Sequence, residues 1–254
     1  MMLAIFGPRL LTGYRDRNVL GRIREQEVDS AGAGYRYQLS SNEKLFILSE
    51  CLNSQKRPEA EGSKPGREEE TTESSYQEGT YAFVVNYEEE TSRESFYASL
   101  NDGIALLKEE GILPSQIQEI VPQQYEAALY SAIDVLEPRN NVAVWKLNLI
   151  SSRQNMNQEN RLLDAYIDAD SGKLYEFYIR TDMEWADIDA QALVRSWAEY
   201  MGLYGMEEYE TKNPLLETTP YYQKYVFPGI GDERTIVTVG FYEGIDELFL
   251  KITK

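Results

Sequence analysis

The order of helical and strand patterns constrains the fold more than any other feature of this sequence. Residues 80–88 alternate large apolar side chains with smaller or polar ones, which is typical of a half-buried strand. A helical pattern over 93–111 is followed by four strand patterns, at 124–136, 141–151, 161–168 and 173–180. A second helical pattern, over 184–203, is followed by three strand patterns, at 220–227, 234–242 and 247–253. Runs of strands after a helix predict an α+β fold, with helices packed on antiparallel sheets.

Four segments follow from these patterns. We predict an N-terminal arm with a first helix over 1–53, an acidic linker over 54–79, and two α+β units over 80–181 and 182–254. Each unit reads as one helix followed by an antiparallel meander. The first helix, at 40–53, starts at a capping box formed by Ser40 and Glu43. The linker is rich in Pro, Gly and Glu and has one large side chain, Tyr76.

Composition removes many kinds of chemistry. The 254 residues contain no histidine and one cysteine, which excludes His-based nucleophile pairs, His-ligated metals and Cys-cluster metal sites. No Walker loop, G-x-S-x-G or S-x-x-K motif is present. The formal net charge of −18 argues against nucleic acid as a partner, because phosphate binding needs a basic face. We therefore expect no catalytic residues, no cofactor and no metal site, and a protein that is not an enzyme.

The N-terminus differs from the rest of the chain. Residues 1–24 carry five Arg and one Asp after a short apolar stretch, so the other residues carry about −22. Three interpretations remain open: an arm that packs on the body, the tail of a membrane anchor that begins before Met1, or an Arg-rich targeting segment. The stretch itself is too short to span a bilayer. We favour a tether at the cell membrane with the body on the extracytoplasmic face, and cytoplasmic location is the alternative.

Residues 142–180 carry the one resemblance to a known family. Val144–Leu149 alternates apolar and polar residues, and Ala165–Glu176 follows, with Asp168-Ala169-Asp170-Ser171-Gly172 at its turn. This segment resembles the closing hairpin of a PepSY module, with Ser171 where the family usually has Thr. The resemblance implies a cystatin-like or PepSY-like arrangement and a regulatory or binding role in an exported or membrane-anchored bacterial protein. It brings no catalytic residues.

Several acidic residues and the single cysteine could be interpreted as functional, but in each case we favour a structural role. Asp168 and Asp170 lack the further ligands of a calcium loop, so we assign them to a hairpin turn in which Gly172 has a positive φ. Glu184, Asp187 and Asp189 lie near the start of a helix, where negative charge favours capping over catalysis. Cys51 follows Glu50, which does not fit a lipobox, so we place Cys51 on the apolar side of a helix.

Aromatic residues crowd one predicted strand. Tyr221, Tyr222, Tyr225 and Phe227 form either part of the sheet or a surface for a ligand or partner. We therefore predict a non-enzymatic binding or regulatory protein whose partner is a protein or peptide of the cell envelope. Two alternatives remain: a carboxylate-dependent hydrolase, and a structural subunit of an envelope or spore assembly.

Overall fold

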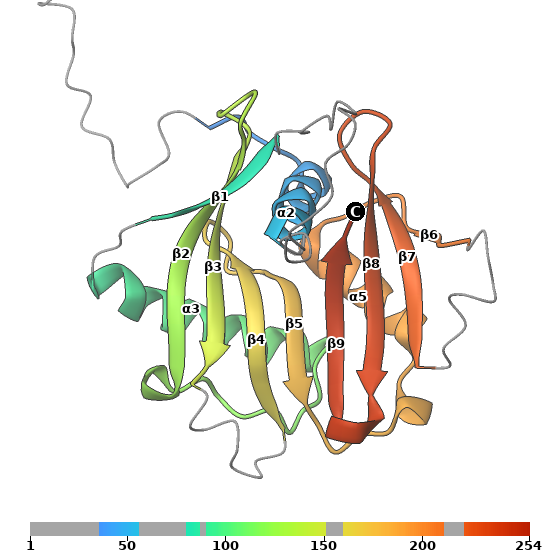
Figure 1. Ribbon diagram of the computed structural model, residues 1–254. Coiled ribbons are helices and arrows are strands. Elements are labelled where there is room, and N and C mark those ends of the chain that lie inside the picture. The colour runs from blue at the N-terminus through green and yellow to red at the C-terminus, as the bar shows by residue number, and fades with distance from the viewer. Residues whose placement is uncertain (1–35, 56–79, 87–89, 151–159, 211–220) are drawn as a thin grey trace, which may run out of the picture. The chain divides into compact units, whose positions relative to one another are not determined.

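The computed structural model describes residues 36–55, 80–86, 90–150, 160–210 and 221–254 (Figure 1). The helices in these residues are α2 (Ser41–Gln55), α3 (Glu90–Glu109) and α5 (Ala190–Met201). The strands are β1 (Tyr81–Val85), β2 (Tyr125–Asp134), β3 (Asn141–Leu149), β4 (Arg161–Asp168), β5 (Leu174–Arg180), β6 (Glu207–Glu208), β7 (Tyr222–Pro228), β8 (Arg234–Tyr242) and β9 (Glu247–Thr253). All strand pairs are antiparallel, which confirms the predicted α+β class.

The nine strands form one sheet in the order β1-β2-β3-β4-β5-β9-β8-β7-β6. The two predicted helix-plus-strand units therefore share a sheet, and they meet where β5 pairs with β9. That pairing is short and joins only Phe177–Arg180 to Glu247–Leu250. Past its end, the carboxylate of Glu176 accepts a hydrogen bond of 3.0 Å from the backbone N–H of Ile252 on β9. A side chain thus continues the hydrogen bonding where the two strands separate.

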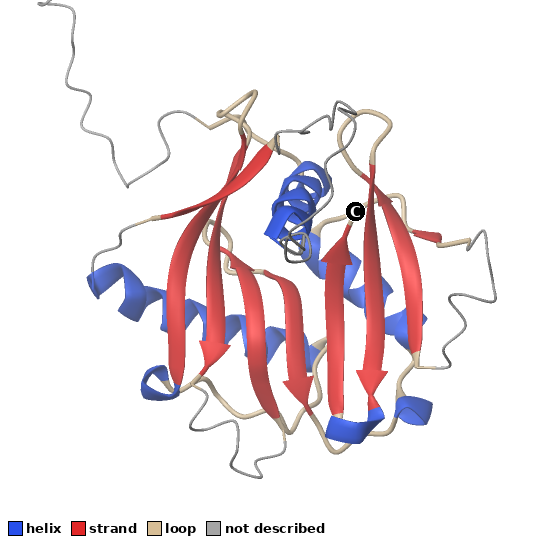
Figure 2. Cartoon of the chain, in the orientation of Figure 1, coloured by secondary structure: helices blue, strands red, loops and turns tan. Residues whose placement is uncertain are grey.

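Helices α3 and α5 pack against the same face of the sheet, behind the strands in Figure 2. The Phe96 ring of α3 stacks on Trp145 of β3, with centroids 4.3 Å apart. The Trp197 ring of α5 meets Phe227 of β7 edge to face, and its indole N–H donates to the Leu174 carbonyl. Because side chains alternate along a strand, Trp145 and Phe227 mark the residues that face these two helices.

Helix α2 packs on the opposite face, across the separation between β5 and β9 (Figure 1). Its buried side chains lie around most of its circumference, including Leu45, Phe46, Ile47, Leu48, Cys51 and Leu52. A helix that is apolar on nearly all sides is typical of one surrounded by protein. Burial raises the pKa of Cys51 to about 12, so its thiol stays protonated and is a poor nucleophile.

Polar contacts tie α2 to both halves of the sheet. The buried amide of Asn42 donates to the carbonyls of Tyr204 and Pro228, and its oxygen accepts from the N–H of Tyr204. Lys44 reaches the turn between β4 and β5, on the other side of the separation. Near the C-terminal end of α2, Glu50 pairs with Lys254 at 2.6 Å.

Most predicted boundaries agree with the structure to within a few residues. Ser40 and Glu43 form the predicted capping box, with N–H to side-chain distances of 2.7 and 3.3 Å. Helix α5 begins at Ala190 rather than at 184, because the Asp189 side chain caps it by accepting from the N–H of Ala192. Glu184 and Asp187 precede this helix, at a short 3-10 turn.

Two predicted segments fall largely or wholly where the structure gives no description. Residues 1–35 of the predicted arm and residues 56–79 of the linker predicted over 54–79 lie outside the described residues. Among the helices that are described, none has the length and apolar character needed to cross a membrane.

Candidate functional site

The sheet face opposite α3 and α5 carries a row of aromatic rings. We call this face, beyond the part that α2 covers, the open face. The register places on it, from β4 to β7, five aromatic residues: Tyr166, Tyr178, Phe249, Tyr242 and Tyr222. Tyr242 is 51% exposed, whereas Phe249 is only 7% exposed. Tyr242 is the residue of the row that suggests an interaction surface, because exposed large aromatic side chains tend to mark such surfaces.

Ring stacking explains why Phe249 is buried although it lies on the open face. Its ring lies 5.8 Å from that of Tyr178 and 4.7 Å from that of Tyr242, with interplanar angles of 22° and 27°. It also lies over Gly240, where a Cβ would collide with its Cζ. Gly240 therefore makes room for this ring, and the stack holds Tyr242 in place.

A cavity of about 550 Å³ opens beside this stack, and we call it the lysine pocket. The register places Lys224, Thr238 and Lys251 side by side on β7, β8 and β9. Lys224 Nζ lies 5.2 Å from the ring centre of Tyr209 and 5.5 Å from that of Tyr222. The described residues that line the pocket are Tyr221, Tyr222, Lys224, Thr238, Phe241, Tyr242, Phe249, Lys251 and Thr253, and none is acidic.

The structure divides the four aromatic residues that the sequence singled out. Tyr221 and Tyr222 line the lysine pocket. Tyr225 and Phe227 are 2% and 0% exposed and lie on the other face, under α5. The four residues therefore do not form one surface, because positions 222 and 225 have opposite parity on the strand.

Sequence reasoning missed Lys224, Tyr242, Phe249 and Lys251. The available signal was the alternation within the three C-terminal strand patterns, which were predicted close to their observed bounds. Which positions of the three strands adjoin one another depends on the register, and the sequence alone does not provide it.

A second, smaller cavity of about 200 Å³ lies on the open face next to Leu52 of α2. Asp164 and Glu176 both line it, together with Lys146, Tyr166 and Tyr178. Burial raises the pKa of Asp164, and the nearby charge of Lys146 offsets this only in part. Glu176 is committed elsewhere, because it accepts from the Ile252 N–H and hydrogen-bonds with Tyr178.

A third cavity, of about 880 Å³, lies between β6, β7, β8 and Lys254. Five carboxylates line it: Glu207, Glu208, Glu210, Asp232 and Glu233. Arg234 and Lys254 offset part of this charge through ion pairs with Glu207 and Glu233. Its composition is the opposite of that of the lysine pocket.

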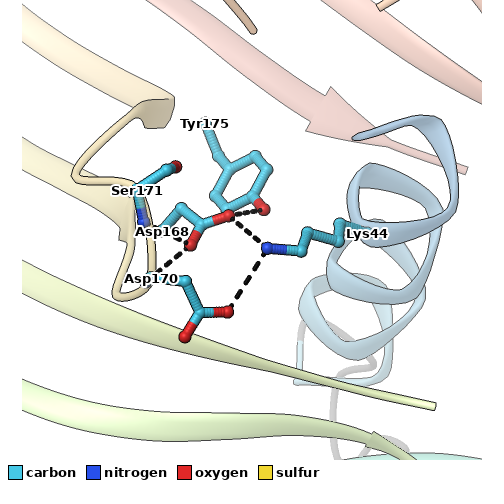
Figure 3. A network of polar contacts seen from close by, with 5 residues as sticks. All are labelled: Lys44, Asp168, Asp170, Ser171 and Tyr175. Carbon is cyan, nitrogen blue, oxygen red and sulfur yellow. Dashed lines mark hydrogen bonds and ion pairs between the residues drawn. The ribbon is translucent and has the colours of Figure 1, made fainter. Parts of the chain in front are cut away.

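A partly buried polar cluster joins α2 to the turn between β4 and β5 (Figure 3). We call it the Lys44 cluster, and it consists of Lys44, Asp168, Asp170, Ser171 and Tyr175. Asp168 Oδ2 accepts from the Tyr175 hydroxyl at 2.7 Å and from Lys44 Nζ at 3.0 Å. Its Oδ1 accepts from the backbone N–H groups of Asp170 and Ser171, at 2.7 and 3.1 Å. Both carboxylate oxygens are therefore fully used within the protein.

Electrostatics in this cluster favour a charged Asp168. Burial raises the pKa of Asp168, but the hydrogen bond from Tyr175 and the charge of Lys44 outweigh it, so the pKa is lowered overall. None of the three cavities described above is lined by Lys44, Asp168 or Tyr175. The geometry is that of a structural link between α2 and the β4–β5 hairpin. The sequence predicted that Asp168 and Gly172 belong to the hairpin turn, and Gly172 has the expected positive φ, 71°.

No family model, curated protein or solved structure matches this chain. Within the described ranges, no three acidic or cysteine side chains are grouped closely enough to hold a metal ion. The resemblance of residues 142–180 to a PepSY module therefore stays a prediction, and function must be argued from geometry.

Proposed function

We propose that this is a non-catalytic binding protein that holds a partner on its open face. The observation that carries the proposal is the aromatic row, in which Tyr242 is 51% exposed, beside a cavity large enough for a small ligand or a short peptide. Tyrosine provides a large contact area with few rotatable bonds, so ordering it on binding costs little. The sheet beneath it is rigid, which favours a surface that is formed before the partner arrives.

We place this activity at the outer side of a bacterial membrane, with the N-terminus as the tether. The basic, apolar start of the sequence and the PepSY-like hairpin support this location. Fractionation of the native, full-length gene product tests it. Recovery in the membrane fraction, with the body accessible to added protease in intact spheroplasts, is the expected result, and full recovery in the cytosol would contradict it.

Site-specific photocrosslinking in the native cell tests the binding face. A photoreactive residue at Tyr242 should give a discrete crosslinked product, because this side chain is the most exposed of the row. Leu106 on α3 is the matched control, since it is 43% exposed but its helix packs on the opposite sheet face. Loss of the Tyr242 product on changing Tyr222 to Ser would support the proposal, and equal products from Tyr242 and Leu106 would refute it.

A carboxylate-dependent hydrolase is the second candidate, and one observation favours it. Asp164 and Glu176 line the same cavity, and the raised pKa of Asp164 is what a general acid requires. We expect the wild-type protein to hydrolyse none of a panel of chromogenic glycosides, because Glu176 is already committed. If the wild-type protein hydrolyses a glycoside and a folded Asp164→Asn variant does not, the hydrolase would be favoured over the binding protein.

A further inference from the structure

We propose that the lysine pocket binds an acidic peptide segment of a partner protein, with carboxylates on the two lysines and an apolar side chain against the aromatic stack. This inference rests on the proposed binding function and specifies its ligand. Four features of the open face support it: the charge of the pocket, the spacing of the lysines, the use of the ring faces, and the depth of the cavity.

Charge is the first support. The chain has a formal net charge of −18, and carboxylates line both of the other cavities described above. The lysine pocket instead contributes Lys224 and Lys251 and no acidic lining residue among those that the structure describes. A local positive site on an acidic body attracts an anionic segment and repels the rest of an acidic partner, which fixes where that partner docks.

Two acids near the pocket already interact with other groups of the chain. Glu243 hydrogen-bonds with the Tyr221 hydroxyl at the rim. Glu247 lies opposite Tyr242 in the β8–β9 pairing. The positive charge of Arg180 opposes the rise in the pKa of Glu247 that burial causes. Within the described residues, Lys251 has no ion-pair partner, so its ammonium group is left for a ligand.

Spacing is the second support. Lys224 and Lys251 flank Thr238 on adjacent strands, which puts their Cα atoms about 10 Å apart. In a polyproline II segment, residues three positions apart point to the same side and are separated by about 9 Å. Two acidic residues with this spacing match the two lysines, and the Thr238 hydroxyl lies between them.

The ring faces distinguish a peptide from an anionic glycan. A sugar binds aromatic residues by stacking on an open ring face, but the Phe249 ring is already stacked with the rings of Tyr178 and Tyr242. Lys224 covers a face of Tyr222. Phe249 and Tyr222 are therefore already engaged through their ring faces, whereas ring edges, which carry partial positive charge, suit carboxylates and the face of an incoming aromatic ring.

The depth of the cavity agrees with a short segment. A volume of about 550 Å³ lies in the range of pockets that hold a small molecule or a few side chains. The ring of Phe249 fills the space that a Cβ at position 240 would occupy, so an apolar side chain of the ligand packs against this ring and not against the backbone of Gly240.

Fluorescence anisotropy with defined probes tests this inference on the full chain. The main probe is a labelled peptide with the core Glu-Pro-Phe-Glu, which has two acids three positions apart. Its controls carry Gln in place of both Glu residues, or Ser in place of Phe. We expect binding of the main probe that is weakened at least about tenfold by either change and by raising salt from about 50 to 500 mM.

Matched variants locate the binding. The double change Lys224→Glu with Lys251→Glu should weaken the peptide at least about tenfold. The control Lys108→Glu with Lys173→Glu makes the same change in net charge on α3 and the β4–β5 turn, and should leave affinity unchanged within about twofold. Circular dichroism and thermal unfolding verify that both variants fold.

Each other outcome has a defined meaning. Equal losses of peptide affinity in the two double variants would show that net charge governs binding, and would overturn the proposal that the peptide binds in the lysine pocket. Tighter binding of an oligogalacturonate than of the main probe, with the Phe→Ser change in the peptide having no effect on peptide affinity, would replace the peptide with a glycan. Absence of binding by every probe, while the Tyr242 crosslink persists, would overturn this inference and leave the proposed function standing; absence of both would remove both.

Discussion

Two lysine sites on this sheet use similar residues for opposite purposes. In the Lys44 cluster, a lysine meets a carboxylate whose exposed side-chain fraction is 5%, and every charge has a partner within the chain. In the lysine pocket, two lysines and several tyrosines line an open cavity in which no described lining residue is acidic. The comparison teaches that a lysine paired with a carboxylate inside the chain stabilises the fold, and we propose that a carboxylate of a partner takes the corresponding place in the lysine pocket.

Removing the Asp168 charge should have the largest effect on stability. Asp168→Asn loses the ion pair with Lys44 and weakens the hydrogen bond from the buried Tyr175 hydroxyl, so we expect a loss of about 2–3 kcal/mol. Urea denaturation measures it. Asp170→Asn is the control, since the Asp170 side chain is 53% exposed and should cost below about 1 kcal/mol. Equal losses in both variants would mean that burial does not distinguish the two carboxylates.

Acid should reproduce part of this loss. Because the folded-state pKa of Asp168 is lowered, its charge contributes stability above the unfolded value of about 3.9, and the contribution disappears as pH falls through the folded pKa. The free-energy gap between wild type and Asp168→Asn should therefore narrow below about pH 4. Denaturation curves at several pH values measure this gap. A constant gap would contradict a charged Asp168 in the folded state.

Crowding the floor of the lysine pocket should have a smaller effect on stability. Gly240→Ala places a Cβ against Phe249 Cζ and 3.0 Å from Tyr222 Cβ, so the stack must shift. We expect a loss of about 1–2 kcal/mol, with peptide binding weakened as well. Gly244→Ala, where nothing lies within 4 Å, is the control. Unchanged peptide affinity in Gly240→Ala would indicate that the stack does not form part of the binding surface.

Neutralising the pocket lysines should change stability least. Lys224→Met with Lys251→Met keeps the length of both side chains and removes charge from an open site, so the free energy of unfolding should change by less than about 0.5 kcal/mol. Peptide affinity should nevertheless fall. Thermal unfolding and anisotropy on the same samples measure the two effects. A large destabilisation would mean that these lysines stabilise the fold as Lys44 does, and it would contradict the difference drawn between the lysine pocket and the Lys44 cluster.

Local sequence patterns were sufficient for most of the elements. β4, β8 and β9 have the predicted bounds, because alternation and turn residues act over a few positions. Asp189 is an example of local chemistry that outweighs a periodic pattern, since its cap delays the start of α5 to Ala190. β6 has only two residues, Glu207 and Glu208, and no pattern of that length predicts a strand.

The candidate site was only partly predictable, because it depends on contacts between distant residues. Lys44 and Asp168 are 124 positions apart, and no local pattern links them. Tyr221 and Tyr222 were identified by composition, but Lys251 became part of the same site only through the register of three strands. The assignment of Tyr225 and Phe227 to a surface failed to separate the two faces of a strand.

The place of β9 in the sheet has a consequence for biosynthesis. This strand is the last in the described sequence, yet it lies between β5 and β8. During translation, β5 and β8 therefore each keep one unpaired edge until residues 247–253 leave the ribosome. Over the same period the Glu176 carboxylate lacks the hydrogen bond from the Ile252 N–H. A nascent or truncated chain without this strand exposes two unpaired strand edges at once, which favours aggregation until β9 inserts.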